Sequence, residues 1–99
     1  MSSAVIAALD EVRGRCVAVK IKFPDTCAGL DPAIDRIGVF LRKASRGTFT
    51  VENEQELAET LYSVREYCKW LIKEYPETKR ECKPLAKLIH KLVTLEGHL

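Results

Sequence analysis

The sequence is poor in glycine and proline and lacks long apolar runs. Its 99 residues include only 5 glycines and 4 prolines, which excludes a collagen-like repeat and a proline-rich linker. No apolar stretch approaches the roughly 20 residues that a membrane-spanning helix needs. With 46% apolar residues the chain can build one small core, which excludes a disordered tail. We therefore expect a single domain over residues 1–99, either a whole protein or a domain of a larger one.

Motifs for targeting and catalysis are also lacking. The N-terminal segment has no basic leader, and Asp10 follows its apolar residues too early for a signal peptide. The chain holds no Gly-x-Ser-x-Gly, no P-loop, no Gly-rich dinucleotide turn, no His-Glu-x-x-His and no Glu-x-x-His. A net charge of +2 is too balanced for a dedicated nucleic-acid binder. We expect a soluble, cytoplasmic protein that is not an enzyme, uses no cofactor and has no small-molecule substrate.

Apolar residues three and four positions apart predict four amphipathic helices, over about 3–22, 32–44, 53–75 and 77–96. Their apolar stripes are, in chain order, Val5, Leu9, Val12, Cys16, Val19 and Phe23; Ile34, Ile37, Leu41 and Ala44, with Phe40 beside them; Leu57, Leu61, Val64, Cys68, Leu71 and Tyr75; and Cys82, Leu85, Leu88, Ile89, Leu92 and Leu95. The short loops between the helices predict an all-α fold, an antiparallel four-helix bundle.

Local sequence also predicts how these helices begin, end and bend. Asp31 is expected to cap the second helix, with Pro32 in its first turn and Gly47 just past its end. A capping box led by Asn53 is expected at the start of the third helix. Pro84 lies inside the fourth helix, where a proline removes one backbone hydrogen bond. We therefore expect the last helix to be kinked or broken at Pro84.

Residues 17–23 are open to a second interpretation. They alternate with a period of two and are rich in β-branched side chains, so they also fit a strand paired with residues 48–51. We favour the helix, because an isolated two-stranded ribbon is barely stable in water. In that case Val17 and Ile21 lie on the back of the helix, and we expect them to be buried between neighbours or to lie in an interface.

The four cysteines form no Cys-x-x-Cys pair, which excludes zinc-ribbon and thioredoxin-like spacings. They are Cys16, Cys27, Cys68 and Cys82. Because three of them belong to apolar stripes, we expect reduced, buried core residues and no metal site. Two alternatives remain open. One is the disulfide framework of a secreted ligand carrier or signalling protein, which a count of free thiols would reveal. The other is a metal site that joins Cys27 or Cys82 to His90 or His98.

Trp70 gives the strongest indication of function. At 100° per residue it lies well over 90° from the apolar stripe of its helix, on a polar face that it shares with Glu74. Tyr67 lies on the flank of that stripe. A tryptophan on a polar face often anchors an interface. We therefore predict a protein–protein interaction, adaptor or regulatory module, self-associating or bound to another protein, with Tyr67, Trp70 and Glu74 in contact with the partner. In the alternative, the loop 24–30 covers Trp70.

A row of basic side chains on the fourth helix indicates a second binding mode. The row consists of Arg80, Lys83, Lys87 and Lys91. Such a row suits an anionic membrane or nucleic acid, although Glu77 and Glu81 interrupt it in the sequence. His90 turns toward the same face and is expected to be a solvated histidine, because the His-x-x-Lys-Gly pattern of histidine phosphotransfer domains is absent.

Overall fold

The computed structural model describes residues 2–95, which are all helical except for short connections and contain no strand. The helices are α1 (Ser3–Lys22), α2 (Asp31–Ser45), α3 (Val51–Glu74) and α4 (Lys79–Leu95), with single 3-10 turns at Ala28–Leu30 and Pro76–Thr78. The all-helical prediction is confirmed. Residues 17–22 are helical, so the strand alternative is wrong.

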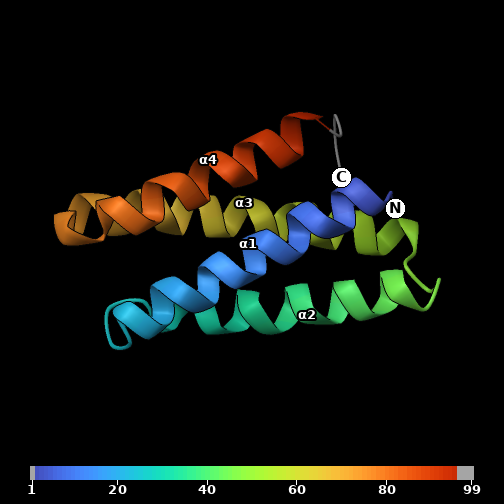
Figure 1. Cartoon of the computed structure of the whole chain (residues 1–99), viewed down its shortest axis with the longest axis horizontal. Coiled ribbons are helices and arrows are strands. Elements are labelled where there is room, and N and C mark those ends of the chain that lie inside the picture. Colours follow the sequence, from blue (N-terminus) through green and yellow to red (C-terminus); the bar gives the residue numbers. More distant parts are fainter. Residues whose placement is uncertain (1, 96–99) are drawn as a thin grey trace.

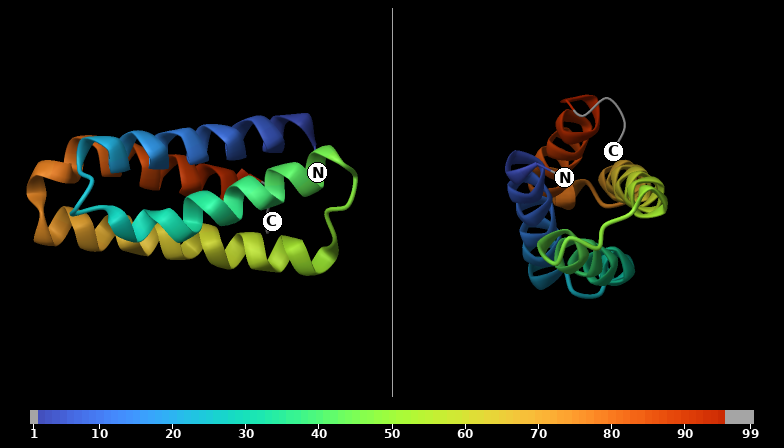
Figure 2. Two further views of the ribbon diagram at one scale, coloured as in Figure 1. Left: turned by 90° about the horizontal axis from the view of Figure 1, so that it is seen from below. Right: turned by 90° about the vertical axis from the view of Figure 1, so that its right-hand side faces the viewer.

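The four helices lie along the long axis of a molecule that measures 39 × 23 × 19 Å (Figure 1). The connections 23–30 and 75–78 lie at one end, and the connection 46–50 lies at the other. α1 packs against α2 and α4, and α3 packs against the same two helices. The end-on view in Figure 2 shows the four helices around a shared interior, which is where the apolar stripes meet.

Burial of the predicted stripes builds the core, because removing apolar side chains from water is the main driving force of folding. On α1 and α3 every stripe residue from Val5 to Val19 and from Leu57 to Leu71 is buried. α2 differs from the prediction. Phe40 is buried and Leu41 only half-buried, because the Phe40 ring packs edge-on against Phe49 of the next connection, 6.2 Å between centroids. The side chain of Leu95 lies outside the described residues.

The back of α1 behaves differently from its core stripe. Val17 is half-buried, whereas Ile21 is 74% exposed. Burial between neighbouring helices is therefore wrong for Ile21. Separately, none of the helices within residues 2–95 is long and apolar enough to cross a membrane.

The starts of α2 and α3 differ from the sequence prediction. The cap of α3 is Thr50, whose hydroxyl accepts from the Asn53 N–H (3.2 Å) while the Asn53 side chain accepts from the Thr50 N–H (2.9 Å). Thr50 is therefore the N-cap residue, and Asn53 is the third residue of the helix, whose side chain completes the capping box. Asp31 caps nothing, because it is already helical, and its carboxylate pairs with Lys20 of α1. Gly47 is placed as predicted, in the left-handed conformation (φ 72°) that ends α2.

α4 is one continuous helix that passes through Pro84, so the expected break does not occur. Pro84 is exposed and lies in the first half of the helix, beyond the turn where a proline is harmless. Because it has no N–H, the carbonyl of Arg80 receives no hydrogen bond from it. The first turns of α4 are thus held by fewer backbone hydrogen bonds than the rest of the helix.

Candidate functional site

The end of α3 carries a cluster of aromatic rings, which we call the aromatic patch: Tyr67, Trp70 and Tyr75. The rings of Tyr67 and Trp70 are stacked, with centroids 5.7 Å apart and planes 16° apart. The ring of Tyr75 meets Trp70 edge-on, at 5.9 Å and 75°. Trp70 is 47% exposed and Tyr75 is 38% exposed. The patch is therefore a continuous aromatic surface in contact with solvent, and the sequence prediction for Trp70 omitted Tyr75.

The connection between α1 and α2 holds the patch in place. The Tyr67 hydroxyl donates a hydrogen bond to the carbonyl of Thr26 (3.2 Å), and the ring lies directly over Gly29. A Cβ atom at Gly29 would lie 2.6 Å from the Tyr67 Oη, so only glycine leaves room for the ring. Burial raises the pKa of the Tyr67 hydroxyl above its ordinary value of 10.0. The loop thus covers Tyr67 and leaves Trp70 accessible.

Polar groups and a shallow groove border the patch. Glu74 is exposed one turn beyond Trp70, and Glu66 pairs with Lys69 at 3.6 Å. On the other side of Tyr67, an open groove of about 150 Å³ runs between α2 and α3. Its walls include Pro32, Ala33, Arg36, Thr60 and Ser63. An aromatic centre with charged and polar groups around it is the usual composition of a protein-binding surface.

The basic row on α4 is exposed along its whole length, as the sequence predicted. We call it the basic face: Arg80, Lys83, Lys87 and Lys91. Of the two acidic residues that interrupt the row in the sequence, Glu81 turns to α1 and pairs with Lys22, whereas Glu77 is exposed. The hydrogen bond from Lys22 lowers the pKa of the Glu81 carboxyl below its ordinary value of 4.5. None of the ion pairs among residues 2–95 involves the basic face.

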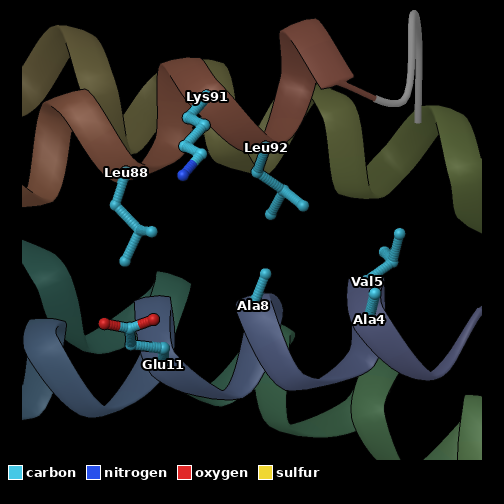
Figure 3. Close-up of a pocket in the computed structure, with 7 residues that line it drawn as sticks. All are labelled: Ala4, Val5, Ala8, Glu11, Leu88, Lys91 and Leu92. Carbon is cyan, nitrogen blue, oxygen red and sulfur yellow. The ribbon is translucent and has the colours of Figure 1, made fainter.

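A pocket of about 220 Å³ opens between α1 and α4 and had not been expected from the sequence (Figure 3). Leu88 and Leu92 of α4 face Ala4 and Ala8 of α1 across it, and the small alanine side chains leave the space unfilled. In the sequence, the only indication of the pocket is that one helix carries small alanine side chains and the other carries large leucine side chains at these positions. Glu11 of α1 and Lys91 of α4 also line the pocket, so one acidic and one basic side chain border its apolar walls.

The four cysteines are free thiols with no exposed surface, as expected for core residues. They come from α1, the α1–α2 connection, α3 and α4, and the parts of these elements that carry them meet at one end of the molecule (Figure 1). Burial raises the pKa of Cys16 to about 12 and that of Cys27 to about 11. A hydrogen bond from the Cys68 thiol lowers the pKa of Cys82 to about 7. The sequence placed three of these residues in the core but gave no sign that all four would gather.

The described residues contain no group of three His, Cys, Asp or Glu side chains that is placed to hold a metal ion. His90 is exposed and lies about two turns further along α4 than the buried Cys82. His98, the other histidine considered as a ligand, lies outside the described residues.

Comparison of the chain with known protein families, with curated proteins and with solved structures finds no match.

Proposed function

We propose that this chain is a non-enzymatic protein–protein interaction module of the adaptor or regulatory type, and that its partner binds the aromatic patch beside Glu74. The observation that carries the proposal is Trp70, a large ring held at 47% exposure by a stacked tyrosine on one side and an edge-on tyrosine on the other. Burying such a ring against a partner releases water from an apolar surface without any chemical step.

The fixed geometry of the patch favours binding because little freedom is lost when a partner arrives. Tyr67 is tied to the Thr26 carbonyl and stacks on Trp70, so both rings hold one orientation before contact. Ordering a mobile side chain at an interface costs about 0.5–1.5 kcal/mol, and a pre-ordered one avoids that cost. Residues of this type dominate measured interface energies, each contributing about 2 kcal/mol or more.

We also infer that the arrangement around the patch is an antiparallel four-helix bundle in a single domain, with α4 bent at Pro84. Short connections at alternating ends of the molecule support the antiparallel order. The missing hydrogen bond to the Arg80 carbonyl supports the bend, since kinks form where a proline interrupts the helical ladder. Four free, buried thiols support a reducing location inside the cell.

Replacing Trp70 by alanine is expected to weaken association at least tenfold and to leave the fold intact, because about half of the side chain is already exposed. We would measure the mass in solution by light scattering over a range of concentrations, and compare capture of partners from lysate if the wild-type chain is a monomer. Tyr62→Ala is the matched control, since Tyr62 is a 60% exposed aromatic residue on another side of the same helix.

The comparison between the two variants decides the proposal. Loss of association in Trp70→Ala alone supports the aromatic patch. Equal behaviour of Trp70→Ala, Tyr62→Ala and the wild type, each with the circular dichroism of a folded helical protein, rules the patch out as the binding surface.

The second candidate function is binding of an anionic membrane or nucleic acid by the basic face. Its support is the exposed row of four cations, beside which the Glu81 carboxylate pairs with Lys22 of α1. Four phosphate contacts on DNA predict a slope of log affinity against log salt of about −3.6, which is roughly a hundredfold loss between 50 and 200 mM salt.

The salt dependence is measured with a DNA duplex and, separately, with vesicles that contain phosphatidylserine. The double variant Lys83→Glu/Lys87→Glu is expected to lose binding, whereas Lys73→Glu, an exposed lysine of α3, should change it little. An affinity that is independent of salt, or equal losses in both variants, contradicts binding by the basic face.

A further inference from the structure

We propose that the pocket between α1 and α4 binds a small molecule with one apolar chain of about eight carbons and one carboxylate, as a ligand and not as a substrate. We call this site the α1–α4 pocket. None of its lining residues belongs to the aromatic patch, so the ligand site is separate from the surface proposed for the protein partner.

The α1–α4 pocket leaves apolar surface uncovered, because small side chains face large ones across it. Ala4 and Ala8 of α1 lie opposite Leu88 and Leu92 of α4, and Val5 lines the same space (Figure 3). Ala8 and Leu88 are only half-buried, so both still present apolar surface to solvent. Protein interiors are normally packed without such gaps, and the atoms beside a gap lose contacts. An apolar chain in the pocket restores those contacts and removes the same surface from water.

The volume of the pocket sets the size of the chain. An apolar cavity of about 150 Å³ holds one benzene ring, which has six carbons. At the same density, the volume of about 220 Å³ between α1 and α4 holds about eight carbons. Pockets for drug-sized ligands begin at about 300 Å³. The α1–α4 pocket is therefore too small for the two acyl chains of a membrane lipid and fits a single short chain.

Lys91 gives the pocket a positive charge. Figure 3 shows its ammonium group between Leu88 and Leu92, directed toward α1. None of the ion pairs among residues 2–95 involves Lys91, whereas Glu11, the acidic residue of the lining, pairs with Arg15 at 3.2 Å. The charge of Glu11 is thus balanced within α1, and the charge at the apolar walls that a ligand can balance is positive. A carboxylate at the end of the chain complements it through a charge-assisted hydrogen bond.

The test is a titration of the isotope-labelled chain with octanoate, followed by nuclear magnetic resonance. We expect saturable shifts at the amides of Ala8, Leu88 and Leu92, with a dissociation constant of about 1 mM or below. Octanol keeps the chain and lacks the charge, so it should bind about tenfold more weakly. Octylamine has the opposite charge and should bind more weakly still.

Three outcomes of this titration overturn the proposal. The first is the absence of a saturable shift up to about 10 mM octanoate. The second is a set of shifts centred on another part of the molecule. The third is equal binding of octanoate and octylamine, which would mean that Lys91 does not select an anion.

A first pair of variants tests whether the chain occupies the space beside Ala8. Ala8→Leu fills the pocket with a side chain of the protein and should abolish octanoate binding. Ala7→Leu is the matched control, because Ala7 is the exposed neighbour of Ala8 and does not line the pocket, so this variant should keep the wild-type affinity. Full octanoate binding by a folded Ala8→Leu variant contradicts the site.

A second pair tests the role of the charge and needs no change to the core. Lys91→Gln should weaken octanoate binding about tenfold and leave octanol binding unchanged. Lys87→Gln removes a neighbouring charge of the basic face that does not line the pocket, and it should change neither affinity. Equal losses in both variants indicate general attraction to the basic face and overturn the proposal. This pair still decides if Ala8→Leu does not fold.

Discussion

Raising the pH from 9 to 11 is expected to lower the free energy of unfolding by about 4 kcal/mol or more. The cause is the raised pKa of three buried thiols. Burial raises the pKa of Cys16 from 9.0 to about 12 and that of Cys27 to about 11, and the contact with Cys82 together with burial also raises the pKa of Cys68. Above pH 9 the unfolded chain loses the protons of these thiols while the folded chain keeps them, so stability falls as pH rises. Each thiol contributes about 1.4 kcal/mol per pH unit. A loss of this size approaches the whole stability of a small domain.

The measurement is urea unfolding followed by circular dichroism at several pH values under reducing conditions. Cys16→Ala removes one of the three buried thiols with a raised pKa and should reduce the slope of stability against pH above pH 9 by about a third. Between pH 7 and 9 the lowered pKa of Cys82 acts in the opposite direction, because its thiolate is favoured in the folded state. A stability curve that is flat from pH 9 to 11 contradicts this account of the core.

The helices and their core faces could be predicted from the sequence because both follow from a local period. The stripes of α1 and α3 are buried from Val5 to Val19 and from Leu57 to Leu71, since a spacing of three and four residues places side chains on one face whatever packs there. The predicted last residues of the two stripes, Phe23 and Tyr75, follow the ends of the helices and are half-buried and exposed. α2 departs from this pattern at Phe40, which contacts Phe49 of the next connection. The ring of Phe49 covers Phe40, and the buried face rotates away from Leu41.

The candidate sites depend on contacts between distant parts of the chain, which a period does not encode. The stripe of α3 showed that Trp70 points away from the core, but not that Tyr67 would be anchored to Thr26. The sequence likewise does not indicate that Glu81 pairs with Lys22, because the two residues lie on different helices. The gathering of the four cysteines likewise depends on which helix ends meet, and that is a property of the topology.

Replacing Gly29 by alanine is expected to destabilise the fold by about 1–3 kcal/mol and to disturb the aromatic patch. The added Cβ would lie 2.6 Å from the Tyr67 Oη and 2.7 Å from its Cζ, so the ring must move and lose its hydrogen bond to Thr26. Because Tyr67 stacks on Trp70, the fluorescence of Trp70 should change together with the free energy of unfolding.

A double-mutant cycle separates this steric effect from an effect of the backbone. Gly29 does not have a positive φ, so alanine can adopt its conformation once the ring is absent. In a Tyr67→Ala background, Gly29→Ala should therefore be neutral or stabilising by about 0.4–1 kcal/mol, through a less flexible unfolded chain. Gly14→Ala is the matched control, because no atom lies within 4 Å of its Cβ position in α1, and it should stabilise the fold by about 1 kcal/mol. An equal loss from Gly29→Ala with and without the Tyr67 ring would mean that the loop itself, and not its contact with the aromatic patch, requires glycine.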